Sequence, residues 1–166
     1  SKAILVPTAE RDAAIGLSIF GPVFRSVRAI MYNSQEERAM IQAASRNADV
    51  PGVVVGVGSD VPDHSDGQRF RRSFSIDRPF AVYIGRIDEN KGCKELFDFY
   101  HRYALTFPGG LDLVLIGSAK MPIPEHPRIH HLGFISDRDK FDALAGADLP
   151  ILPSYFESFC IVSVDT

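Results

Sequence analysis

Two cationic side chains stand between two glycines in the segment 85–92, which reads GRIDENKG. The first glycine ends an apolar run that we expect to be a strand, and the second precedes a predicted helix. Arg86 and Lys91 therefore lie where α/β proteins bind ligands, at the carboxyl end of a strand. A guanidinium fork, a mobile ammonium and the amides of a helix N-terminus all suit phosphate oxygens. The segment predicts an anion site, and a surface turn closed by an Arg–Asp or Lys–Glu pair is the alternative.

A pair of carboxylates marks the last segment of the sequence. Glu157 follows a predicted strand that ends at Pro153, and Asp165 lies eight residues further on, in a predicted helix that begins at Ser158. With one carboxylate in the loop and the other two turns down the helix, both can face one cleft. A capping carboxylate and an unrelated surface aspartate fit the same spacing, so the spacing alone leaves both interpretations open.

Two weaker patterns point to other chemistries. Gly56 and Gly58 follow a predicted strand as in half of a dinucleotide fingerprint, but the third glycine is absent and Pro62 stands where a helix should begin. We therefore reject nicotinamide and flavin binding there. Asp137 and Asp139 form a D-x-D pair, which can chelate a divalent metal that holds a diphosphate. Stabilisation of a helix N-terminus is the favoured alternative for this pair.

The elements that must position these residues alternate between short apolar runs and helical patterns. Continuous apolar runs such as 113–116 indicate strands covered on both faces, as in parallel sheets. Ser34 and Ser136 begin capping boxes, and 95–107 carries apolar residues at helical spacing. The alternation predicts an α/β fold. The predicted strands are 2–7, 27–33, 52–58, 80–85, 112–117, 128–133 and 148–153.

The composition is that of an ordinary globular protein. Among 166 residues, 18 Lys and Arg stand against 21 Asp and Glu, so the net charge of -3 offers no broad basic face for nucleic acid. No apolar run reaches the roughly 18 residues of a membrane span, and the first ten residues make a poor signal peptide. Cys93 and Cys160 lack metal-ligand spacing and form no disulfide framework. We expect a reduced, cytoplasmic protein.

The polar segment 59–79 interrupts the alternation. It is rich in Ser and Asp and contains Arg69, Arg71 and Arg72. We interpret it as a linker between two folding units, 1–58 and 80–166, and its arginines as a solvated loop.

The order of four motifs resembles glycosyltransferase family 4, a family of the GT-B fold. The motifs are GRIDENKG at 85–92, LDLVLIG at 111–117, HLGFISD at 131–137 and ADLPILPSYFESFCIVSVD at 147–165. The resemblance covers most of the chain and implies a Rossmann-like parallel sheet with flanking helices, part of a two-domain enzyme. Residues 1–58 would be the C-terminal end of the acceptor-side domain, and 80–166 the first part of the nucleotide-sugar-binding domain. We expect a fragment that is inactive by itself.

The resemblance also implies a reaction: a hexosyl group passes from a nucleotide-diphosphate-sugar donor to a glycan or lipid-linked acceptor, with retention of configuration and without a bound metal or cofactor. Arg86 and Lys91, in a substrate-binding loop that begins at Gly85, would bind the donor diphosphate and stabilise it as it leaves. Glu157 would hold hydroxyls of the donor sugar. The remaining implied contacts are backbone amides of Ser158, Phe159, Cys160 and Ile161 with the sugar and diphosphate, Asp165 with the ribose, and Phe134 and Ile135 with the nucleobase.

The chain departs from the family pattern at several of these positions. Asp165 stands where Glu is usual, and Ser158 and Cys160 where Gly is frequent. These departures leave a non-catalytic α/β binding module open as an alternative. The D-x-D pair leaves a second alternative open, a metal-dependent sugar-nucleotide enzyme that uses Asp137 and Asp139. The resemblance allows peripheral membrane association of the full-length enzyme at the inner face of the membrane, and it leaves the base, the sugar and the acceptor unassigned.

Overall fold

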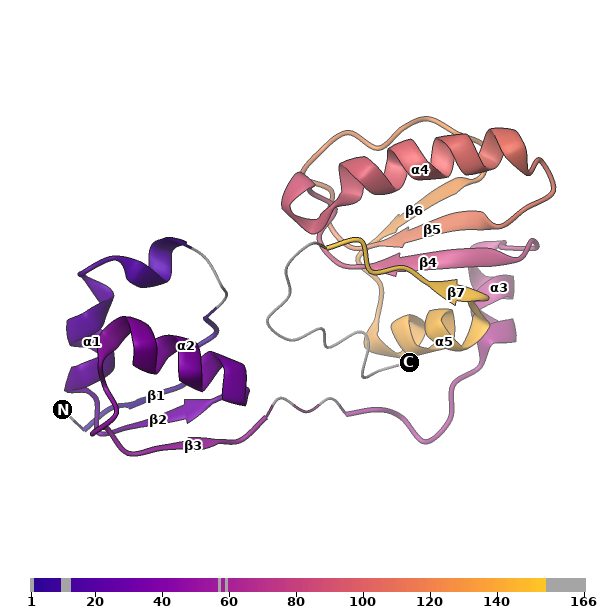
Figure 1. Ribbon diagram of the computed structural model, residues 1–166. Coiled ribbons are helices and arrows are strands. Elements are labelled where there is room, and N and C mark those ends of the chain that lie inside the picture. Colours follow the sequence, from indigo (N-terminus) through magenta and orange to yellow (C-terminus); the bar gives the residue numbers. More distant parts are fainter. Residues whose placement is uncertain (1, 10–12, 57, 59, 155–166) are drawn as a thin grey trace. The chain divides into compact units, whose positions relative to one another are not determined.

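The computed structural model describes residues 2–9, 13–56, 58 and 60–154. These residues form two compact units, the first up to residue 58 and the second from residue 60 (Figure 1). Each unit contains a parallel β-sheet with helices packed on it. The predicted α/β class, a Rossmann-like parallel sheet with flanking helices, is confirmed. Predicted site residues 157–161 and 165 lie outside the described part of the chain.

The first unit is a three-stranded sheet in the order β1-β2-β3. Its core, which includes Ile30, Tyr32 and Ile41, lies between one face of the sheet and the helices. Side chains alternate between the two faces of a strand. Leu5 and Val54 pack against this core, and their neighbours Ile4 and Val53 point to the other face and are 58% and 55% exposed. The elements in chain order are β1 (Ile4–Leu5), η1 (Ala13–Gly16), α1 (Phe20–Ser26), β2 (Ala29–Tyr32), α2 (Gln35–Ser45) and β3 (Gly52–Val54).

Helix α2 begins where the predicted capping box places it, but the box closes differently. The Ser34 hydroxyl accepts a hydrogen bond from the Glu37 backbone N–H at 3.0 Å, as expected. The Glu37 carboxylate, only 5% exposed, accepts from the N–H groups of Asn33 at 2.6 Å and Ala9 at 2.7 Å. A buried carboxylate needs such donors, so Glu37 joins the ends of two strands as well as starting a helix.

The second unit is a four-stranded sheet in the order β6-β5-β4-β7. Helix α4 covers one face, and α3 and α5 cover the other (Figure 1). Strands β4 and β5 are buried between these layers, which explains their continuous apolar runs. The elements are α3 (Gly67–Phe74), β4 (Phe80–Ile84), η2 (Glu89–Lys91), α4 (Cys93–Thr106), β5 (Asp112–Ile116), β6 (Ile129–Gly133), α5 (Asp137–Gly146) and β7 (Leu149–Pro150).

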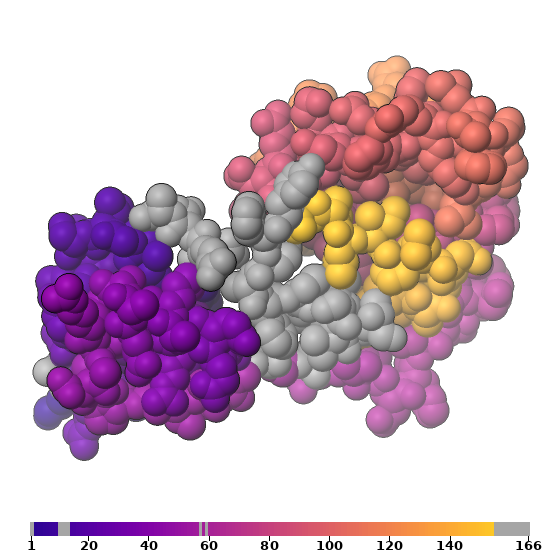
Figure 2. Space-filling model, viewed as in Figure 1, coloured from indigo at the N-terminus to yellow at the C-terminus, as the bar shows by residue number. Residues whose placement is uncertain are grey.

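Among the described strands, β7 lies at one edge of this sheet and β6 at the other. Strand β7 pairs with β4 through Pro150 opposite Val82, and an edge position tolerates a proline because only one side of the strand is paired. The yellow surface of Figure 2 shows this part of the chain reaching solvent, and Leu149 is 48% exposed.

All seven predicted strands are confirmed, each with narrower bounds than predicted. The predicted helices after Ser34 and Ser136 and the helix over 95–107 correspond to α2, α5 and α4. Among the described residues, no helix is both long and apolar enough to cross a bilayer.

The interpretation of the arginines in 59–79 as a solvated loop is wrong. Residues 67–74 form helix α3, whose Phe70 is fully buried against Phe80 of the sheet. Asp66 starts the helix by accepting from the Arg69 N–H at 2.9 Å. Phe70 and Phe74 lie four residues apart, on one face of a helix, but they are surrounded by arginines that make the segment look polar.

Two of the three arginines in this segment, Arg69 and Arg71, pack against the rest of the unit. The Arg69 guanidinium bonds to Asp139 at 2.7 Å and to Asp142, both on α5, and the Arg71 guanidinium lies 4.8 Å from the centre of the Phe80 ring. Arg72, whose side chain is 71% exposed, is the one of the three that stays largely in solvent.

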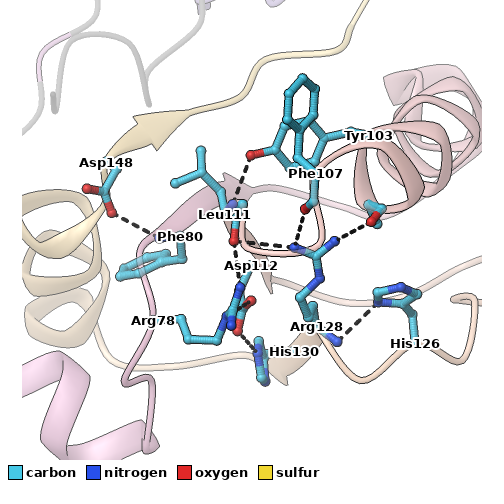
Figure 3. Close-up of polar contacts among 12 residues, drawn as sticks. Arg78, Phe80, Tyr103, Phe107, Leu111, Asp112, His126, Arg128, His130 and Asp148 are labelled. Carbon is cyan, nitrogen blue, oxygen red and sulfur yellow. Dashed lines mark hydrogen bonds and ion pairs between the residues drawn. The ribbon is translucent and has the colours of Figure 1, made fainter.

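Polar contacts tie the amino-terminal ends of the strands together (Figure 3). Asp112, at the start of β5, is 4% exposed and accepts from Arg78 Nε and from His130 Nε2, each at 2.9 Å. The Arg128 guanidinium donates to carbonyl oxygens at the end of α4, including Ala104 at 3.0 Å. A cation there stabilises the negative end of the helix. These contacts at the amino-terminal ends of the strands stabilise the fold. The candidate site lies at the other end of the strands, their carboxyl ends.

Candidate functional site

The second unit has a cavity of about 250 Å³ at the carboxyl ends of β4, β5 and β6. Open parallel sheets bind ligands at this edge. Four of the predicted site residues lie together in its lining, although they come from segments about 50 residues apart. The described lining residues are Ile84, Gly85, Arg86, Ile116, Gly117, Ser118, Phe134, Ile135, Asp137 and Lys140.

Phe134 gives this cavity an exposed aromatic edge. It follows β6 and its side chain is 84% exposed, while its neighbour Ile135 packs partly against the core. A large apolar ring left in solvent beside a cavity is available to stack on a flat ligand.

The floor of the cavity depends on a close approach between two strand ends. Gly85 donates its N–H to Ile116 O at 2.9 Å, and Gly117 donates to Gly133 O at 2.8 Å. Gly117 has φ of +132°, and a Cβ there would stand 2.0 Å from Gly85 O. Only glycine fits this backbone and this spacing, so the cavity floor is made of main chain.

The loop from β4 to α4 is organised by Asp88. Its carboxylate pairs with Arg86 Nε and accepts from the Lys91 N–H at 2.9 Å. Partial burial acts to raise the pKa of Asp88, but the hydrogen bonds from Arg86 and Lys91 outweigh it, so the pKa lies below its usual value. The Arg–Asp pair that the surface-turn alternative requires is therefore present. Arg86 nevertheless lies on the cavity lining, so the pair does not exclude an anion site.

Lys91 is placed differently from Arg86. It ends η2, is partly buried, and is absent from the described lining of the cavity. Gly92 follows it with φ of +70°, and a Cβ there would stand 2.3 Å from Pro153 O. The chain that leaves β7 thus passes directly against the start of α4.

The D-x-D pair is divided between two roles. Asp137 lies on the cavity lining, whereas Asp139 accepts from Arg69 and from the Ser136 hydroxyl, each at 2.7 Å. The Ser136 hydrogen bond and the Arg69 guanidinium lower the pKa of Asp139. Because that carboxylate is already engaged by a cation, the arrangement favours the helix-start interpretation over chelation. No cluster of three or more metal-ligating side chains occurs in the described ranges.

The sequence patterns missed several lining residues. Ser118 and Lys140 reach the cavity from the end of β5 and from the first turn of α5. Asp88 is not on the described lining, and the sequence pattern indicates only a surface pair for it. Its signal was present, because an Asp before a short polar run commonly accepts from the backbone N–H three residues on, as it does here.

Together the fold and the cavity define an α/β protein with a cavity at the carboxyl ends of the strands of a parallel sheet. The chain matches no known protein-family model. Over 95 residues it is 30% identical to glycogen synthase 1 of Synechococcus sp. strain JA-3-3Ab, and equally identical to glycogen synthase 1 of strain JA-2-3B'a(2-13). The matched part is 49% of this chain and 18% of each relative, so the chain spans under a fifth of the length of these relatives.

Proposed function

We propose that the chain is part of a nucleotide-sugar glycosyltransferase and that its second unit binds the donor. The observation behind this proposal is the cavity that brings Gly85, Arg86, Phe134 and Ile135 together at the carboxyl edge of the sheet. Its volume of about 250 Å³ suits one part of a ligand, such as a nucleobase with its stacking face, rather than a whole donor. The similarity to glycogen synthases supports the same class of enzyme.

The chemistry follows from the charges around the cavity. When the bond to the sugar breaks, negative charge grows on the diphosphate, and fixed cations in a partly desolvated site stabilise that charge. Arg86, whose side chain is 53% exposed and which lies on the cavity lining, would supply the first cation. Lys91, in the same loop but outside the described lining, would supply the second. Phe134 and Ile135 would pack on the base.

The finer parts of the proposal rest on the family resemblance. They are the GT-B architecture, a retaining family 4 reaction, a donor-sugar contact from Glu157, amide contacts from 158–161 and a ribose contact from Asp165. The donor is the substrate and no resident cofactor is required. We place the acceptor, a glycan or a lipid-linked glycan, on the side of the first unit, and the enzyme in the cytoplasm at the inner membrane face.

Titration calorimetry of this chain with UDP, GDP and ADP tests the donor site. At least one nucleotide should bind, and the variant Arg86→Ala/Lys91→Ala should bind it at least tenfold more weakly, since each charge-assisted hydrogen bond contributes about 1.5–3 kcal/mol. Arg72→Ala/Arg102→Ala removes the same charge from exposed positions on α3 and α4 and should bind like wild type. Equal binding by all three proteins contradicts the diphosphate role.

Turnover by the full-length enzyme separates the alternatives. Transfer or hydrolysis of the donor that continues in excess chelator and is abolished by Glu157→Ala supports the proposal. Turnover that requires Mn²⁺ or Mg²⁺ favours the metal-dependent enzyme. Donor binding without any turnover favours the non-catalytic module.

A further inference from the structure

Asp88 stands at the centre of the loop that holds both proposed diphosphate ligands. Its side chain is only 13% exposed, whereas the side chain of Arg86, two residues earlier, is 53% exposed. One carboxylate oxygen pairs with Arg86 Nε, and the other accepts from the Lys91 N–H. The Asp88 carbonyl also accepts from the Cys93 N–H at 3.2 Å, at the first residue of α4. A single residue thus connects Arg86, Lys91 and the start of the helix.

The Asp88 contact leaves the rest of the Arg86 guanidinium open. The Arg86 carbonyl accepts from the Tyr83 hydroxyl at 2.7 Å, which fixes the backbone of the residue. Within the described residues, the side chain of Arg86 has Asp88 as its acceptor, through Nε alone. Both Nη groups remain for a ligand, and Arg86 lies on the cavity lining. An Arg held at Nε presents its Nη groups as a preformed fork for two oxygens of one anion.

We propose that Asp88 is a positioning residue for the diphosphate: it holds Arg86 by Nε so that the Nη edge faces the cavity. This inference rests on the proposed donor site and goes beyond it, because it assigns the orientation of the cation to a residue that does not touch the ligand. A preoriented guanidinium loses less side-chain entropy when it binds.

The charge of Asp88 acts against anion binding, which makes the proposal sharply testable. A carboxylate beside a phosphate site repels the ligand, so its removal should tighten binding if charge were its only effect. If Asp88 orients Arg86, its removal should weaken binding instead. The two effects have opposite signs, and the direction of the change decides between them.

The variant Asp88→Asn separates the contact from the fold of the loop. An asparagine still accepts from the Lys91 N–H through its carbonyl oxygen, but its amide nitrogen cannot accept from Arg86 Nε. Asp88→Ser makes the same separation with a shorter side chain that also suits this N-cap position. Glu89→Gln removes an equal charge from the adjacent exposed residue, and it is the matched control.

Calorimetry with GDP, UDP, ADP and inorganic pyrophosphate measures the effect. We expect Asp88→Asn and Asp88→Ser to raise Kd about five- to tenfold, and Glu89→Gln to leave it unchanged or slightly lower. In an Arg86→Ala background, Asp88→Asn should leave Kd unchanged or slightly lower, as Glu89→Gln does, because only the repulsion by its charge is then removed. A purely structural role would weaken binding equally in both backgrounds.

The outcomes also separate this inference from the proposed function. Wild-type binding that is sensitive to Arg86→Ala but unchanged or tighter in both Asp88 variants overturns the positioning role and leaves the donor site in place. An equal loss with and without Arg86 also overturns it. Failure of the wild-type chain to bind any of the four probes overturns the donor site, and the positioning role with it.

Discussion

A methyl group on Gly117 would stand 2.0 Å from the carbonyl oxygen of Gly85. This contact joins the ends of β5 and β4 below the cavity, and Gly117 has a φ of +132°, which side-chain-bearing residues rarely adopt. We expect Gly117→Ala to push the two strand ends apart, to destabilise the second unit by about 2 kcal/mol or more, and to weaken nucleotide binding. Chemical denaturation and calorimetry of the variant measure both effects.

Gly109→Ala is the control for this substitution. Gly109 lies in the turn before β5, and no heavy atom stands within 4 Å of a Cβ built there. The control should keep both the stability and the nucleotide affinity of the wild type. If Gly117→Ala behaves like Gly109→Ala, the cavity floor does not depend on this close approach.

Tyr100 on α4 makes the protein sensitive to alkaline pH. Burial is the main cause that raises the pKa of Tyr100 from 10.0 to about 12, and the side chain is only 6% exposed. The folded state therefore holds the phenolic proton more tightly than the unfolded state. Its contribution to stability is complete below pH 10 and is lost as the pH rises from about 10 to about 12.

Tyr100→Phe tests this assignment. The Tyr100 hydroxyl lies 3.0 Å from the carbonyl oxygens of Leu111 and Arg128, which share its proton. The variant should lose about 1 kcal/mol at neutral pH, and its unfolding free energy should fall less than that of wild type between pH 10 and 12. Urea denaturation across this pH range gives both numbers, and an unchanged alkaline slope contradicts the prediction.

Asp142 makes the packing of α3 on α5 sensitive to acid. It is 3% exposed and accepts from the Asp66 N–H at 2.7 Å and from the Arg69 guanidinium. Burial alone would raise the pKa of Asp142, but these hydrogen bonds lower it below the usual 3.8. A lowered pKa means that the stabilisation is present above about pH 3.8 and is lost as the pH falls further.

Asp142→Asn should remove part of this acid dependence and cost about 1–3 kcal/mol at neutral pH, because a buried ion pair loses its anion. Asp98→Asn is the matched control: Asp98 pairs with Lys94 at 3.1 Å on the exposed face of α4, with a side chain 64% exposed. Such a surface pair contributes little. Equal losses of unfolding free energy in the two variants would contradict a special role for Asp142.

The sequence patterns could predict elements whose signal is local. Continuous apolar runs gave β4 and β5, and Ser34 and Ser136 gave helix starts that the structure confirms. Helix α3 escaped prediction because its apolar signal consists of Phe70 and Phe74 alone, and because Arg69 and Arg71 find partners 70 or more residues away. Pairing over such a distance depends on the tertiary fold, which no local pattern contains.

The candidate site divides in the same way. Gly85 and Arg86 could be predicted because they come after a strand of a parallel sheet, at the end where such sheets bind ligands. Phe134 and Ile135 were expected only from the resemblance to glycosyltransferase family 4. The orientation of Arg86 by Asp88 and the contributions of Ser118 and Lys140 could not be predicted, since they depend on how loops of different strands turn toward the cavity. The place of Lys91 at the end of η2, outside the described lining of that cavity, likewise depends on how this loop turns.

The first unit should associate with itself through its sheet. Parallel sheets are normally covered on both faces, but Ile4, Val6, Val53 and Val55 are between 48% and 58% exposed on strands β1 and β3 and the residues that follow them. Neighbouring apolar side chains of this kind favour aggregation.

We expect light scattering to show concentration-dependent association of this chain, and Val53→Lys/Val55→Lys to reduce it without lowering nucleotide binding. Lys94→Glu, at an exposed position in the second unit, should leave association unchanged. A monodisperse, thermally robust monomer for the wild-type chain would show that this face needs no cover.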